Sequence, residues 1–427
     1  KTALSSFLPI DYRNQMIPSL FSIPLIFFSG VDSDSQVLYD WNNVMLEAVR
    51  EESIGPNLAV RNFAILYGST FDSLNAVEKK YNAYHFKESF PAAEPSPDAI
   101  AAGSCYTIAT SLHPSRKGSF DKLVKPYLSN SASSRTRRSF SFGAKVARSF
   151  LELRKNDGSS TSVTDVPTTK TGKWQRTPPR DRPPVQPHWR NVKPFCLDST
   201  NPFLAPPPPQ LDSKEYLDAL IKVKLLGSKQ SKVRTREQKN IAKFWSDFSY
   251  SSTPPGHWNE IATFVARTKK LNLLETARLL ALLNFTMADA GIAAFETKYR
   301  YRYWRPIQAI RQADEIKETS RLRDPSWDSL LESPSHPEYV SGHSCYSGSA
   351  ARLLALFFKT DDISFIAFSD ARPEEKRTFH SFEKCAEEIG MSRIYGGIHY
   401  EFSNRAGLEM GRKIADHTFT HFLNQTR

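Results

Sequence analysis

Cysteine is scarce in this chain. Four cysteines occur among 427 residues, and no two of them form a Cys-x-x-Cys pair. This spacing excludes zinc ribbons and thioredoxin-like redox motifs. Four cysteines permit two disulfides but do not require them, so cysteine usage leaves the redox compartment open.

Long apolar runs are scarce as well. The 15 residues Met16–Gly30, "MIPSLFSIPLIFFSG", are too few to span a bilayer comfortably. They look like the core of a signal peptide, although Pro18 and Pro24 interrupt them and no Ala-x-Ala-like cleavage site follows. We therefore expect a leader, or candidate signal peptide, over residues 1–30 and a secreted protein. We expect no membrane-spanning segment elsewhere.

The sequence contains no nucleic-acid-binding motif, although its formal net charge is +12. The basic residues are spread along the chain, and the one local cluster, Arg135–Arg138, is short. We therefore expect no nucleic-acid partner. The charge indicates either a solvated basic surface or a basic pocket for an oxyanion.

Helical periodicity dominates the rest of the sequence. Apolar residues recur three and four apart in several long stretches, and no stretch alternates like a series of strands. The helical stretches are 37–80, 98–112, 139–157 and most of 214–427. The sequence therefore predicts an all-α, mainly helical fold built from helix bundles.

Residues 158–213 interrupt this pattern. They are rich in Pro, Ser and Thr, so they cannot form regular helix or a central strand. They are either a linker or an extended segment wrapped around a domain, and Trp174, Trp189 and Phe195 favour wrapping because they need a surface to pack on. We expect one domain over 31–427, with its active-site half at 214–427.

Cationic residues open the first of three chemically suggestive clusters, "KYRYRYWRP". Lys298 and Arg305 stand seven apart, about two helical turns, so both can face one way. Pro306 predicts that the helix ends at Arg305. Two cations on one face repel each other unless an anion lies between them. The alternative is an ordinary basic surface.

The second cluster is "HPEYVSGHS", His336–Ser344, which precedes an apolar helical run. A helix start exposes unpaired N–H groups and partial positive charge, so it suits an anion. The simpler interpretation is that Ser341 is an ordinary N-cap.

The third cluster is "SRIYGGIHYEFSN", in which Arg393 and His399 flank Gly396-Gly397. Paired glycines permit close approach of a ligand. The alternative is a loop with an exposed Arg and a core His. Taken together, the clusters supply cations, helix-start amides, a hydroxyl and two imidazoles, which suit a tetrahedral oxyanion. They lack the grouped carboxylates or thiols of a cation site.

The order Lys-x6-Arg-Pro, Ser-Gly-His, Ser-Arg-x5-His resembles that of the vanadium-dependent haloperoxidases. It also resembles the related type 2 phosphatidic acid phosphatases and bacterial acid phosphatases. "TPPGHWNEIA" and "NLAVRNFAILYGSTFDSLNAV" look like the chloroperoxidase-type branch. The resemblance implies two four-helix bundles and a vanadate cofactor. It also implies hydrogen peroxide, a halide and an organic acceptor as partners, with homo-oligomers as one option.

The resemblance implies a role for each matching residue. His399 would bond vanadium as the axial ligand, and His343 would be the acid–base group. The cations would neutralise the equatorial oxygens, to which Ser341 and the Gly342 N–H would donate hydrogen bonds. The vanadate-binding set would be Lys298, Arg305, Ser341, Gly342, His343, Arg393 and His399.

Three positions bear on activity. Chloride-oxidising fungal members have Phe where this chain has His336, and algal bromide-using members have His, so bromide or iodide is expected. The equally weighted alternative is that His336 only forms hydrogen bonds within its loop. Val340 replaces a frequent Pro. Ser403 stands where the family pattern has Asp, so a backbone carbonyl or Asn404 is expected to orient His399.

Three functions from different classes fit these residues. A haloperoxidase is preferred. An acid phosphatase would form a phosphohistidine at His399 with His343 as general acid, but the missing Asp at 403 should impair it. A non-catalytic phosphate- or vanadate-binding protein is the third option.

Overall fold

The computed structural model describes residues 35–426 except residues 167, 248 and 249. The described residues belong to one unit, Ser33–Arg427, by the density of their contacts. The expected leader over residues 1–30 lies outside the described residues.

Five helices form the N-terminal part of this unit. They are α1 (Gln36–Glu51), α2 (Pro56–Glu78), α3 (Pro97–Leu112), α4 (Lys117–Leu128) and α5 (Ser134–Arg154). Apolar faces at helical spacing account for α1, α4 and α5, each of which buries one face and exposes the other, whereas α2 is buried almost all round as a core helix. The sequence analysis did not predict α4, which is the shortest of the five helices and has Pro126 in its interior.

Helices also dominate the C-terminal part, in agreement with the expected mainly helical class. They are α6 (Lys214–Gly227), α7 (Arg236–Phe244), α8 (Thr253–Thr268), α9 (Leu273–Tyr301), α10 (Pro306–Arg311), α11 (Gly342–Phe358), α12 (Phe382–Tyr395) and α13 (Glu401–His421). A short antiparallel hairpin, β1 (Asp362–Ala367) and β2 (Arg377–Ser381), was not predicted.

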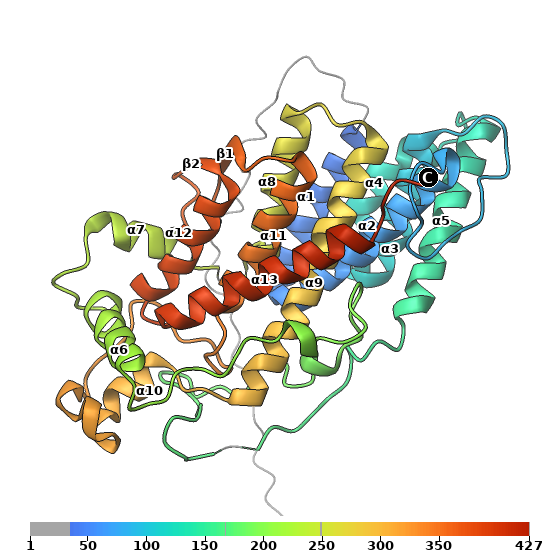
Figure 1. Ribbon diagram of the computed structural model, residues 1–427. Coiled ribbons are helices and arrows are strands. Elements are labelled where there is room, and N and C mark those ends of the chain that lie inside the picture. The colour runs from blue at the N-terminus through green and yellow to red at the C-terminus, as the bar shows by residue number, and fades with distance from the viewer. Residues whose placement is uncertain (1–34, 167, 248–249, 427) are drawn as a thin grey trace, which may run out of the picture. The chain divides into compact units, whose positions relative to one another are not determined.

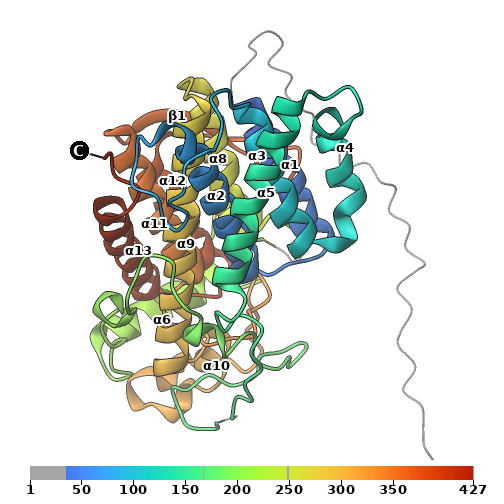
Figure 2. The same cartoon turned by 90° about the vertical axis from the view of Figure 1, so that its right-hand side faces the viewer.

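Helix α9 lies between two groups of helices. On one side it packs against α2, which packs in turn against α3 and α5; on the other it packs against α11 and α13. Figure 2 shows these groups on opposite sides of α9. By length and composition α9 could cross a membrane, contrary to our expectation, but its apolar window is wholly buried, as in a core helix.

The Pro-rich segment packs on this scaffold and contains, among its described residues, only two short 3-10 helices, Trp189–Asn191 and Asn201–Phe203. Its aromatic side chains Trp174, Trp189 and Phe195 are buried, as the wrapping interpretation requires. The backbone N–H groups of Phe195 and Cys196 donate to Asp289 in α9 at 2.6 and 2.7 Å. Figure 1 shows the segment running along the lower end of α9.

Candidate active site

The chain turns between Lys298 and Arg305, so the two residues do not lie on one helix. The expectation that a single helix reaches Arg305 was wrong. Helix α9 ends at Tyr301, and its C-cap, Arg302, is left-handed with φ 51°. Pro306 then begins α10, with Arg305 as the N-cap. Proline is favoured in the first turn of a helix, so here it starts a new helix after the old one has already ended.

The ammonium group of Lys298 is fully buried and holds the loop before α11. Its Nζ donates to the carbonyl oxygens of Pro337, Glu338 and Val340 at 3.1, 2.9 and 2.5 Å. An ammonium has three donors, so these bonds use them all. Lys298 therefore contributes charge to the site and fixes the loop.

Arg305 connects the first and third clusters. Its guanidinium donates to the Ile398 carbonyl at 2.7 Å and lies 3.2 Å from Nε2 of His399. It also lies 3.1 Å from Nδ1 of His336, a partly exposed side chain. The His336 ring packs against Phe295 in a tilted orientation, with the ring centroids 5.5 Å apart. His336 therefore touches the cation cluster at its edge.

The second cluster forms the start of α11. Ser341 is the N-cap, and its hydroxyl oxygen accepts from the backbone N–H of Ser344 at 3.3 Å and from the Ser344 hydroxyl at 3.0 Å. Among the described residues, the N–H groups of Gly342 and His343 have no acceptor. No atom lies within 4 Å of the place where a Cβ of Gly342 would stand. An anion can therefore approach this helix start closely.

Arg393, in the last turn of α12, is buried and reaches the start of α11. Its guanidinium lies 3.2 Å from Nε2 of His343 and donates to the Trp245 carbonyl and the Ser392 hydroxyl. Nε2 of His343 also lies 2.9 Å from a carboxylate oxygen of Asp247. The cation and the acid–base candidate therefore share one corner of the site.

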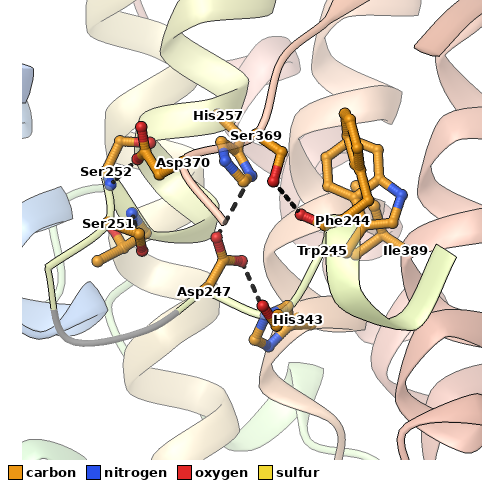
Figure 3. A network of polar contacts seen from close by, with 12 residues as sticks. Phe244, Trp245, Asp247, Ser251, Ser252, His257, His343, Ser369, Asp370 and Ile389 are labelled. Atoms are coloured by element: carbon orange, nitrogen blue, oxygen red, sulfur yellow. Dashed lines mark hydrogen bonds and ion pairs between the residues drawn. The ribbon is translucent and has the colours of Figure 1, made fainter. Parts of the chain in front are cut away.

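Asp247 bridges two histidines, as Figure 3 shows. One of its oxygens faces His343, and the other lies 3.5 Å from Nδ1 of His257. Burial alone would raise the pKa of Asp247, but His257, His343 and Arg393 together lower it. Sequence reasoning missed Asp247, since it stands 96 residues before His343.

A second missed carboxylate, Glu338, orients His399. Its Oε1 accepts from Nδ1 of His399 at 2.6 Å and from the backbone N–H of Tyr400 at 3.1 Å. Asn404, expected to take this role, instead donates to the Gly390 carbonyl and accepts from Ser344. That expectation was wrong. The sequence signal that could have revealed Glu338 was the carboxylate within the motif "HPEYVSGHS".

The glycine pair before His399 serves chain packing. Gly397 has a φ of +79°, and a Cβ there would lie 2.4 Å from the carbonyl oxygen of Gly227 in α6. The close approach is therefore made by a backbone, where we expected a ligand. This turn places Ile398 and His399 beside Arg305.

The charges of the site are unbalanced. Lys298, Arg305 and Arg393 are buried, and none forms an ion pair within the part of the chain that the structure describes. Burial lowers the pKa of Arg305 and of Arg393 to about 10, and burial followed by the charge of Arg305 lowers that of Lys298 well below its usual value. Glu338 opposes the lowering at Lys298 and Arg305, and Asp247 opposes it at Arg393, but among the described residues no carboxylate pairs directly with these cations, which favours an anion between them.

Burial and the cations of the site also shift the pKa values of the histidines. Burial, then the cations Arg305 and Lys298, lower the pKa of His399 well below its usual value. Burial, then Arg393, lower the pKa of His343 to about 4, although Asp247 opposes this shift. Burial raises the pKa of Glu338 to about 7, against the lowering effect of Arg305 and Lys298. A bound anion would offset the cations and make protonation of the histidines easier.

The structure thus brings the three clusters into one site. Contacts join Lys298 to the second cluster, Arg305 to the second and third, and Arg393 to the second. The predicted residues brought together are Lys298, Arg305, His336, Ser341, Gly342, His343, Arg393 and His399. Buried cations, helix-start amides without acceptors among the described residues, and an imidazole nitrogen that faces Arg305 fit a tetrahedral oxyanion.

Comparisons with known proteins agree with this chemistry. The family model described as "VCPO second helical-bundle domain" matches residues 278–427. The vanadium chloroperoxidase of Curvularia inaequalis is 24% identical over 285 residues, which cover 52% of this chain and 46% of that protein. The chain therefore spans about half the length of that curated relative.

Solved structures match nearly the whole chain. A bacterial vanadium-dependent iodoperoxidase is 26% identical, with a TM-score of 0.81 over 92% of this chain and 97% of the other. A holo-type bacterial vanadium-dependent chloroperoxidase shares the fold at 14% identity, with a TM-score of 0.71 over 91% and 98%. Family model, curated relative and solved structures all indicate similarity to the vanadium haloperoxidases.

Proposed function

We propose that this protein is a vanadate-dependent haloperoxidase, which uses hydrogen peroxide to oxidise a halide to a hypohalous-acid-type species that halogenates an organic acceptor. One observation carries the proposal: three buried cations, none in an ion pair among the described residues, lie in the site of His343 and His399, with Arg305 beside Nε2 of His399 and Arg393 beside His343. Bound vanadate would supply a Lewis acid that activates peroxide toward the halide. The names of the similar proteins support this chemistry.

The chain's own residues would hold the oxyanion as follows. Nε2 of His399 would bind the vanadium, with its ring fixed through Nδ1. Arg305 and Arg393 would donate to the oxyanion oxygens, together with the Gly342 N–H and the Ser341 hydroxyl. Lys298 would act through its charge and through the loop it holds, because its donors are already used.

His343 would move protons at the open side of the oxyanion. It is partly exposed, so it can exchange protons with solvent, and Asp247 stabilises its charged form. Oxidation of a halide by peroxide requires a proton for the departing oxygen, which a positioned imidazole can deliver.

Phosphomonoester hydrolysis at the same site is the second candidate. The argument against it from the sequence was Ser403 in place of Asp, but Glu338 provides His399 with a buried carboxylate at 2.6 Å. A nucleophilic His supported in this way could form a phosphohistidine. The absence of Asp at 403 therefore no longer separates the two functions.

A paired assay tests the proposal. Purified protein is freed of bound anion and reloaded with orthovanadate or left empty, and each form is given hydrogen peroxide, bromide and a phenolic dye. Release of p-nitrophenol from its phosphate is followed in parallel. We expect vanadate-dependent bromination that inorganic phosphate inhibits and excess vanadate restores. Bromination indifferent to both anions, or phosphatase activity alone, contradicts the proposal.

Halide choice follows from His336. The His336 imidazole contacts Arg305 and is partly exposed. The path by which a halide reaches the site would therefore be more hydrated than with a phenylalanine ring at this position. Chloride is harder to oxidise and more strongly hydrated than bromide or iodide. We therefore propose that bromide and iodide are the substrates, with chloride turned over poorly.

The substitution His336→Phe tests this choice. We expect a higher ratio of chlorination to bromination than in the unmodified protein, measured on the same dye at equal halide concentrations. Because both rates come from one variant, a general loss of activity cancels in the ratio. Efficient chlorination by the unmodified protein, or an unchanged ratio, would exclude this role of His336.

A further inference from the structure

Glu338 is the one carboxylate in contact with His399 among the described residues. Its side chain is fully buried, and that of His399 is 3% exposed. Its backbone carbonyl accepts from Lys298 at 2.9 Å, and its Oε1 accepts from His399 and from Tyr400. Glu338 therefore joins the loop before α11 to the end of α9 and the start of α13.

The bonding pattern decides which nitrogen of His399 carries hydrogen. The Tyr400 N–H can only donate, so Oε1 must be an acceptor, whether or not the other oxygen of Glu338 is protonated. The guanidinium of Arg305, which can only donate, lies 3.2 Å from Nε2 of His399, so Nε2 must be the acceptor and the hydrogen of the neutral ring lies on Nδ1, 2.6 Å from the same Oε1. A neutral imidazole has one N–H, so Nε2 carries a lone pair and faces the cations.

No residue after His399 can replace this contact. Asn404 is engaged with Gly390 and Ser344. Ser403 is buried, and its hydroxyl has no hydrogen-bond partner among the described residues. Oε2 of Glu338 is also without a partner. The Ser403 hydroxyl lies near enough to the Glu338 carboxyl to lower its pKa, without reaching hydrogen-bond geometry.

We infer that Glu338 is a positioning residue that fixes the Nδ1–H tautomer of His399 and so presents the Nε2 lone pair to the oxyanion's central atom. The tautomer follows from the hydrogen bonds alone, whereas the presentation to vanadium rests on the proposed function. Glu338 would thereby supply from the loop before α11 the carboxylate that position 403 lacks.

Two variants of similar volume separate positioning from packing. In Glu338→Gln the amide oxygen can still accept from His399 and Tyr400, while its NH₂ group can donate to the Ser403 hydroxyl. In Glu338→Met no acceptor remains. The control Glu332→Gln changes an exposed carboxylate of the same segment, which pairs with Arg182.

The first readout is the tautomer itself, in protein without vanadate. Two-dimensional NMR of ¹⁵N-histidine-labelled protein distinguishes Nδ1–H from Nε2–H, and the His399 signals are identified by their absence from His399→Asn. We expect Nδ1–H in the unmodified protein, in Glu338→Gln and in Glu332→Gln, and loss of that preference in Glu338→Met. An Nδ1–H tautomer retained in Glu338→Met, or absent from the unmodified protein, overturns the inference.

The second readout is the dissociation constant of orthovanadate, measured by equilibrium dialysis. We expect it to rise about 10–100-fold in Glu338→Met, as for other partners of ligating histidines, and less in Glu338→Gln. The double variant Glu338→Met/Ser403→Asp should recover part of the loss, because the new carboxylate enters the space beside residue 338. Wild-type affinity in Glu338→Met overturns the inference. If the unmodified protein binds no vanadate, the proposed function fails while the tautomer result still decides this inference.

Discussion

His343 and His399 are held by different carboxylates and should differ in what their removal costs. We expect His399→Ala to abolish vanadate retention, because the substitution would remove the imidazole that we propose as the vanadium ligand. We expect His343→Ala to retain vanadate and to lose turnover by roughly 10²–10⁴-fold, the usual contribution of a proton-transfer group. Dialysis against orthovanadate and bromination rates measure the two effects.

The control for both variants is His380→Ala, which changes an exposed histidine of β2. It should leave retention and turnover unchanged. Equal vanadate affinity in the unmodified protein and in His399→Ala would refute the axial assignment.

Asp247 should set the protonation of His343. The carboxylate raises the pKa of His343 against burial and Arg393, which together bring it to about 4. Asp247→Asn should therefore lower this pKa further, as measured from histidine ¹⁵N shifts during an acid titration of protein without vanadate. An unchanged or higher pKa would contradict the bridging role seen in Figure 3.

The sign of the linked stability change follows. Unfolded histidine takes up a proton near pH 6.5 and folded His343 near pH 4. Stability from neutral His343 is thus present above pH 6.5 and is lost as the pH falls from 6.5 toward 4. In Asp247→Asn the pKa of His343 should be lower still, so the loss of stability should extend to lower pH values.

At the scale of elements, the turn between α12 and α13 should tolerate no side chain at Gly397. Gly397→Ala would place a Cβ at positive φ, a cost of roughly 1–2 kcal/mol, and 2.4 Å from the Gly227 carbonyl oxygen. We expect a loss of at least this size in the free energy of unfolding, and weaker vanadate binding because His399 is displaced. Urea unfolding and dialysis measure these effects.

The matched control is Gly118→Ala, because Gly118 lies in α4 with nothing within 4 Å of a Cβ. It should leave stability unchanged or slightly higher, since alanine is the better helix former. If the two variants unfold alike, the turn does not need glycine.

At the scale of the whole molecule, the site should link stability to anions. Lys298, Arg305 and Arg393, which form no ion pair among the described residues, gather three positive charges in the site, and Arg305 repels Lys298. An anion that binds only the folded protein should stabilise it by about 2.7 kcal/mol at a concentration 100 times its dissociation constant. We expect vanadate and phosphate to raise the melting temperature, while chloride at equal ionic strength does so less.

Arg393→Gln removes one of these cations and should weaken the anion effect. In the anion-free protein the same change costs less than removal of a paired arginine would, since no carboxylate is left without a partner. A melting temperature equally sensitive to vanadate in both proteins would place the anion elsewhere.

The helical class could be predicted from the sequence, and so could the candidate residues that the structure brings together around Arg305 and the start of α11. Apolar spacing is a local property, so it predicted helix over 98–112, close to α3 (Pro97–Leu112), and over the stretches 37–80 and 139–157 in which α1, α2 and most of α5 lie. It failed for α4 and for the hairpin β1–β2, and it placed Lys298 and Arg305 on one helix because the early stop at Arg302 leaves no periodic signal.

Only the tertiary structure decided what surrounds those pocket residues. Glu338 meets His399 across 61 positions and Asp247 meets His343 across 96, and no local pattern encodes such distances. The same folding commits Lys298 to the carbonyls of the loop before α11 and leaves the three cations without a carboxylate ion pair among the described residues. The chain thus specified the groups that can hold an oxyanion, while packing decided which carboxylate supports each histidine.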